Sequence, residues 1–258
     1  YLQLLIMCHC VGHSDFFKNN LTFAETGPEN IIQRFKNAKK RIDSYIEDPS
    51  IGIEKVERIL DSAHALSLHI PPNCKEYIPH RERRKELITR IKSGDPLVIN
   101  RNPDQFPIDD EIDLLSFISE MALNLEDWER DIINIVRLES AYFMPQIRTK
   151  IMNEGWACMM HEKILNMLGI PDEYFLSFIR LHNQVVRPHL GRINPYHLGF
   201  KIFKYIEETQ GFDECLRIRE THNDETFLKN YLNEELCKEL NLFTYSFNRK
   251  EGYNQIAD

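Results

Sequence analysis

The stretch MNEGWACMMHEK, residues 152–163, indicates both the type of fold and the type of site that this chain contains. It reads as part of a helix, because helical periodicity dominates this region. Glu154 and His161 are seven residues apart, so two turns place them on one face, with Cys158 between them. A carboxylate, a thiol and an imidazole therefore share one stripe. The simpler alternative is an amphipathic helix with Glu154 as an acidic residue of its first turn.

A second stretch, MCHCVGHSDFFKNN (7–20), carries two histidines at helical spacing. His9 and His13 are four residues apart, which places both imidazoles on one face of a helix. Two imidazoles at this spacing are a common way to hold Zn²⁺ or a similar divalent ion. Because the chain contains ten histidines, chance alone can supply such a pair, and the pair by itself does not establish a site.

The same helical period runs through most of the chain, interrupted by loops that contain proline or glycine. We predict loops at 70–79, 93–109 and 187–195, and a single strand at 240–247. The sequence therefore predicts a mainly α, multi-helix single domain over residues 1–258, with a short β element near the C-terminus. We predict helices at 1–19, 29–47, 52–67, 80–90, 109–121, 126–143, 147–168, 171–184, 195–209, 212–221 and 224–239.

Composition and charge exclude several classes of protein. The formal charge of −8 argues against binding that depends on neutralising nucleic-acid phosphates. The basic run at 80–90 also carries Glu82 and Glu86, which predicts a salt-bridged surface helix. The six cysteines form no CxxC pair, so we expect reduced thiols in a cytoplasmic protein, and no apolar run is long enough for a membrane span. The chain opens at Tyr1 inside an apolar-periodic segment, and we expect it to be a piece of a longer protein.

Taken together, the two quoted stretches resemble the zincin metallopeptidases of the glutamate-ligand type. There, HExxH supplies two histidines, and a glutamate in an NEG-(F/W)-A context supplies the third ligand. The resemblance implies a zincin-like two-helix site in which His9, His13 and Glu154 bind a divalent metal, with zinc expected, and His161 is a fourth ligand or a substitute base. It departs from that class at Cys10, where the general-base glutamate should stand. It therefore supports a metal site better than it supports peptide hydrolysis.

Three longer blocks resemble the stage V sporulation protein R (SpoVR) family. They are GHSDFFKNN (12–20), LEDWERDIINIVRLESAYFMPQIRTKIMNEGWA (125–157) and GRINPYHLG (191–199), in the family's order. The resemblance runs through nearly the whole chain. Family members are usually longer at both ends, which agrees with the expectation of a core segment.

The resemblance implies a cytoplasmic protein tied to spore-cortex formation, or to stress and stationary phase where no spores form. It also implies protein partners, a PrkA-type serine kinase and a von Willebrand A-type protein, whose genes often neighbour those of the family. It carries over no settled biochemical activity and no oligomeric state. We expect no nucleic-acid partner.

Three side chains are candidates for a catalytic role. His161 would be a base if it is not a ligand. Tyr142 is either a core aromatic with a satisfied hydroxyl or a donor to a developing oxyanion. His189, in the irregular stretch 187–195, is either a surface histidine or a further ligand or proton-transfer group.

The residues leave two functions open. One is a zincin-like metal-dependent hydrolase of amide or peptide bonds, in which the metal lowers the pKa of water and polarises the carbonyl. The other is a non-catalytic regulator or scaffold for protein partners, which the missing general base favours. A di-iron type of redox site is disfavoured, because the Glu-x-x-His spacing is absent at Glu154.

Overall fold

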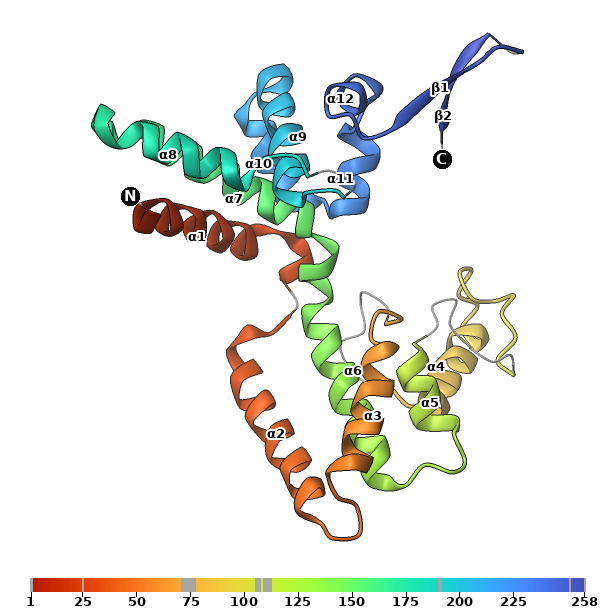
Figure 1. The fold of residues 1–258 in the computed structure, drawn as a ribbon. Coiled ribbons are helices and arrows are strands. Elements are labelled where there is room, and N and C mark those ends of the chain that lie inside the picture. The colour runs from red at the N-terminus through yellow and green to blue at the C-terminus, as the bar shows by residue number, and fades with distance from the viewer. Residues whose placement is uncertain are drawn as a thin grey trace. The chain divides into compact units, whose positions relative to one another are not determined.

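The computed structural model describes residues 2–24, 26–70, 78–104, 108, 113–189, 192–250 and 252–257, and at 244, 245 and 254–257 it describes the backbone alone. Parts of the three predicted loops, and the predicted helix start at 109–112, lie outside these residues. The described residues are mainly helical, with one β-hairpin near the C-terminus (Figure 1). The prediction of a mainly α fold with a short β element is thereby confirmed.

The helices follow one another with mostly short connections. None of the helices in the described part of the chain is both long enough and apolar enough to cross a membrane.

β1 (Thr244–Asn248) pairs antiparallel with β2 (Tyr253–Ala257). The strand was expected from residue 240, but α12 ends at Glu239 and residues 240–243 lead out of it. The other elements are α1 (Leu2–Asn19), η1 (Leu21–Phe23), η2 (Pro28–Asn30), α2 (Ile31–Glu47), α3 (Ile53–Ala65), α4 (His80–Lys92), α5 (Leu114–Met121), α6 (Asp127–Arg148), α7 (Lys150–Met167), α8 (Asp172–Val185), α9 (Pro195–Gln210), α10 (Phe212–Thr221), α11 (Asp224–Tyr231) and α12 (Glu234–Glu239).

The chain divides into two compact units, one of Tyr1–Glu25 with Gln146–Asp258 and the other of Thr26–Pro145. The expectation of one domain over residues 1–258 stays a prediction. The boundary falls within α6. Proline removes a backbone donor and was expected to kink or interrupt the helix at Pro145. The helix is not interrupted there, because α6 continues through Pro145 to Arg148, and α7 begins after Thr149.

The unit Thr26–Pro145 has a core formed by α3, α5 and α6. Asp113 organises the start of α5, because its carboxylate accepts a hydrogen bond from the backbone N–H of Ser116. The same carboxylate forms a buried ion pair with Arg137 of α6, with Nε and Oδ2 2.6 Å apart. The buried apolar side chains of this core are Ala63, Ile70, Leu115, Ile133, Val136 and Met144.

α7 is the central helix of the other unit. Buried side chains lie all around it between Met152 and Leu165, as expected for a helix enclosed by its neighbours. Glu154 lies beyond its first turn, so the alternative of an amphipathic helix with Glu154 as a first-turn acid is wrong. The main packing partners of α7 are α1 and α9 (Figure 1).

Glycines allow these helices to approach closely. A Cβ added to Gly155 of α7 would lie 2.2 Å from the carbonyl carbon of Gly199 on α9, and one added to Gly199 would lie 2.0 Å from the carbonyl oxygen of Ile151. A Cβ on Gly12 of α1 would lie 2.8 Å from the Cα of Ala157 on α7. Backbone therefore packs against backbone at both crossings.

A carboxylate from elsewhere in the unit satisfies the N-terminus of α7. Asp224, the first residue of α11, accepts hydrogen bonds from the backbone N–H groups of Ile151 at 2.8 Å and Met152 at 2.9 Å. These amides have no partner within their own helix, and a helix N-terminus favours a negative charge. Burial nevertheless dominates and raises the pKa of Asp224 to about 6.

We expect Gly155→Ala to destabilise this unit, because the added methyl group overlaps the backbone of α9. Overpacking typically costs about 1–3 kcal/mol, and an added Cβ only 2.2 Å from backbone predicts a loss at or above the upper end of that range. Gly169→Ala is the matched control: its φ is +58° and nothing lies within 4 Å of an added Cβ, so only left-handed strain of about 1–2 kcal/mol is expected. Urea unfolding followed by circular dichroism compares the two, and equal losses would contradict the close crossing.

Asp224 predicts a pH dependence of stability. Below about pH 4 the carboxyl is protonated in both states, and between about pH 4 and 6 only the folded state keeps the proton. The contribution of Asp224 is therefore lost as pH rises through about 6, by at most about 3 kcal/mol. We expect this fall in the free energy of unfolding to disappear in Asp224→Asn and to persist in the exposed control Asp213→Asn, in urea titrations from pH 4 to 7. A wild-type curve parallel to that of Asp224→Asn would contradict the prediction.

Candidate metal centre

The facing sides of α1 and α7 bring together the four residues predicted as metal ligands. His9 and His13 lie one turn apart on α1, and Glu154 and His161 lie two turns apart on α7. The close approach of Gly12 to Ala157 brings the two helix backbones near each other beside these side chains. The four do not surround one point, however, because they divide into two groups that share His9.

The outer group consists of His9, His13 and Glu154. The Nε2 atoms of the two imidazoles are 3.1 Å apart. The Oε2 atom of Glu154 lies 3.4 Å from Nε2 of His13 and 3.9 Å from Nε2 of His9. The three side chains are between 17% and 23% exposed, so an ion can reach them from solvent.

Neighbouring polar groups orient this outer group. Nδ1 of His13 lies 2.8 Å from Oδ1 of the buried Asn153, which makes Nδ1 the protonated nitrogen and leaves a lone pair on Nε2. The Tyr196 hydroxyl donates to the Glu154 carboxylate; burial, then this negative charge and the hydrogen bond, raise the pKa of Tyr196 to about 12. Among the described residues, Oε2 of Glu154 is buried and has no hydrogen-bond donor.

The inner group consists of His9, Cys158 and His161. Nδ1 of His9 lies 3.1 Å from Nδ1 of His161, and Cys158 and His161 are fully buried. Behind them, Nε2 of His161 lies 2.8 Å from Nδ1 of His182. Burial, then the neighbouring imidazoles, lower the pKa of His9 to about 4 and that of His161 to about 3. Both rings are therefore neutral near pH 7, the form in which histidine binds a metal.

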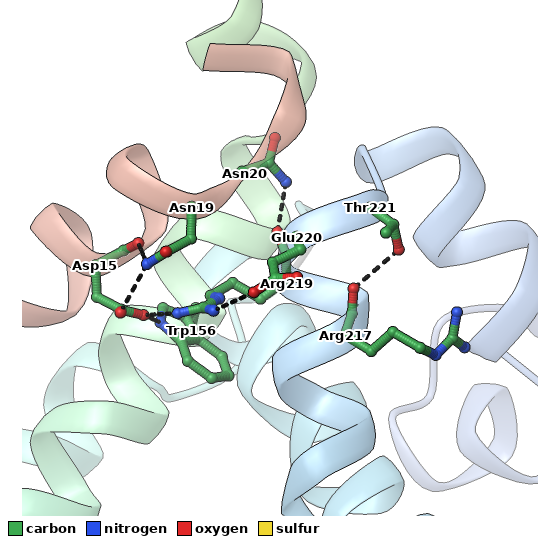
Figure 2. A network of polar contacts seen from close by, with 8 residues as sticks. All are labelled: Asp15, Asn19, Asn20, Trp156, Arg217, Arg219, Glu220 and Thr221. Atoms are coloured by element: carbon green, nitrogen blue, oxygen red, sulfur yellow. Dashed lines mark hydrogen bonds and ion pairs between the residues drawn. The ribbon is translucent and has the colours of Figure 1, made fainter. Parts of the chain in front are cut away.

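A polar network next to the site holds α1 against α7 and α10 (Figure 2). Asp15, two residues beyond His13, accepts hydrogen bonds from Trp156 Nε1 at 2.9 Å and from the buried guanidinium of Arg219 at 2.5 Å. Arg219 also lies over the Trp156 ring, 5.4 Å from its centroid. Asn20 donates to the backbone carbonyl of Arg219 at 2.6 Å. This network fixes how far along α7 the two histidines of α1 lie.

The remaining predicted residues lie apart from the two groups or in the other unit. Cys10 is an exposed free thiol. His189 is half-buried in a short bridge with Arg192, outside both groups. Tyr142 belongs to the unit Thr26–Pro145, where its ring packs edge-on against Phe35 and Phe143. The catalytic roles of Tyr142 and His189 stay predictions.

The sequence did not reveal the roles of three residues that shape the site. Asn153 directly precedes Glu154 in the NEG motif, and this position was the only indication in the sequence that Asn153 lies near the site. Tyr196 follows the N-cap Asn194 and Pro195 at N1 of α9. The sequence therefore could predict that Tyr196 lies in the first turn of a helix, but it could not predict the contact with Glu154. His182 was a polar candidate beside the irregular stretch 187–195, where loops often line sites, but its contact with His161 depends on packing and could not be predicted.

Comparisons with known proteins place the sequence in a family. The chain matches the family described as "SpoVR like protein" over residues 1–258. "Uncharacterized protein YcgB" of Escherichia coli (strain K12) is 30% identical, in a match that covers 99% of this chain and 59% of the relative. The chain thus spans about three fifths of that relative's length. No solved structure matches.

Proposed function

The chain belongs to the SpoVR-like family. From the geometry of the site we propose that it binds a divalent metal ion at His9, His13 and Glu154. Zinc is the ion that a set of two imidazoles and one carboxylate favours. One observation carries the proposal: two imidazole nitrogens and a carboxylate oxygen converge, and that buried oxygen has no hydrogen-bond donor among the described residues.

The spacing of the three ligand atoms supports this proposal. Zinc–nitrogen bonds of about 2.0–2.1 Å in a tetrahedron place ligand atoms about 3.3 Å apart. The separations of 3.1 and 3.4 Å agree with that value, and the 3.9 Å separation needs a small shift of Glu154. Asn153 accepts a hydrogen bond from Nδ1 of His13, as the outer partners of histidine ligands commonly do. This keeps the proton on Nδ1 and leaves Nε2 free to bind the metal.

Hydrolysis of an amide or peptide bond is the activity that fits three protein ligands on a solvent-accessible side. Zinc sites with three protein ligands and an open position are typically catalytic. A bound zinc ion would supply a polarised carbonyl and water of lowered pKa. Tyr196 would hold the Glu154 carboxylate in place, while the partly exposed imidazole edges of His9 and His13 would face the substrate.

A second function is that of a non-catalytic regulator. It is favoured because neither Cys10, which stands at the position of the general base, nor His161 is placed to act as that base. Cys10 is exposed, and His161 is fully buried behind His9, so His161 would reach a substrate proton only through His9. In this alternative the metal stabilises the packing of α1 on α7. The partners would be the PrkA-type kinase and the von Willebrand A-type protein, in a cytoplasmic sporulation or stress pathway.

We expect protein purified without added metal to contain zinc by elemental analysis, and His13→Ala and Glu154→Gln each to contain one equivalent less. Both changes remove a ligand, while the folding of α1 and α7 depends on other contacts. His222→Ala, which removes an imidazole elsewhere in the same unit, is the control and should keep the wild-type content. Wild-type metal content in both ligand variants would refute the site.

Cobalt substitution separates the two functions. If the site has an open position, acetohydroxamate should bind the ion and shift the visible cobalt spectrum in a saturable way. The shift should be absent in Glu154→Gln and unchanged in His222→Ala. A cobalt spectrum that does not respond to acetohydroxamate would indicate a closed structural site and favour the regulator.

A further inference from the structure

The two ring nitrogens of His9 face two different sets of neighbours. Nε2 faces His13 and Glu154, as described above. Nδ1 lies on the other side of the ring, 3.1 Å from Nδ1 of His161. The thiol of Cys158 completes this second set, whose three ligand atoms all lie within 4.8 Å of one another.

The second set is largely buried, and a further buried histidine orients one of its members. Cys158 and His161 are fully buried, and Cys158 is a free thiol. His182, itself 5% exposed, holds His161 from behind at 2.8 Å and packs edge-on against Phe200. With His161 donating from Nε2 to His182, the lone pair on Nδ1 points toward His9.

We infer that His9, Cys158 and His161 form a second, buried metal position, with His9 bridging it to the outer site. A thiolate with two imidazoles is a ligand set for zinc. This inference shares His9 with the proposed function but rests on Cys158 and His161, which the outer site does not use.

Binding at this position releases protons and involves no oxidation. The Cys158 thiol would lose its proton as the sulfur–metal bond forms, and with both positions filled His9 would also lose its ring N–H and bridge them as an imidazolate. Both protons go to solvent. Burial, then the carboxylates of Glu154 and Glu162, raise the pKa of Cys158, so the thiol keeps its proton until a cation binds. The same carboxylates favour a positive ion nearby.

Cobalt titration of the full chain tests the inference, because a cobalt–thiolate bond gives a near-ultraviolet charge-transfer band that imidazole and carboxylate ligands do not give. We expect two equivalents of cobalt and this band in the wild type. Cys158→Ser should lose the band and one equivalent. Cys215→Ser is the matched control, since Cys215 is a fully buried free thiol of the same unit, bonded to the Phe203 carbonyl. It should keep both.

Glu154→Gln separates this inference from the proposed function. It should lose one equivalent of cobalt but keep the near-ultraviolet band, because Glu154 is a ligand of the outer site and not of the inner one. A wild type without the band, or a band that survives in a folded Cys158→Ser or Cys158→Ala, would overturn the second position. The 3.1 Å contact between His9 and His161 would then be a plain hydrogen bond between neutral rings. Unchanged cobalt content in Glu154→Gln would instead refute the outer site.

Discussion

The contact between the backbones of α1 and α7 is the constraint on which the candidate site depends. Gly12 lies against Ala157, and any side chain larger than hydrogen at Gly12 would push the helices apart. At that separation, side chains of ordinary length from both helices meet in one small volume. At the other crossing, Gly155 and Gly199 bring α9 even closer to α7, and Tyr196 in the first turn of α9 then reaches Glu154.

The site is surrounded by residues that fix its position without entering it. Asp15 joins α1 to Trp156 and Arg219, and Asp224 satisfies the start of α7. Both carboxylates accept hydrogen bonds from N–H groups of another helix. Asp15 lies two residues from His13, and Asp224 binds the amides of Ile151 and Met152, close to Glu154. The ligands therefore do not have to create the fold that holds them, as they would in a small zinc finger.

The sequence predicted the parts of this picture that depend on local geometry. Helical spacing placed His9 with His13 and Glu154 with His161, and motif order paired the two helices. It could not show that His9 has one nitrogen for each of two groups, because that depends on the rotation of a ring inside the packed unit. Nor could it show that α7 is buried along most of its length, or that Tyr142 belongs to the other compact unit, since both follow from contacts between distant segments.

The unit that contains the site is discontinuous in sequence, because the whole unit Thr26–Pro145 is inserted between α1 and α7. During synthesis, α1 leaves the ribosome long before α7, α9 and α10 exist to cover it. Phe16 is fully buried in the folded unit, and its side chain stays exposed to solvent until the C-terminal half of the chain has been made. The inserted unit has its own core, formed by residues of that unit. A nascent chain thus carries two histidines of the candidate centre without the glutamate that completes it, and the three candidate ligands can meet only when α7 has emerged.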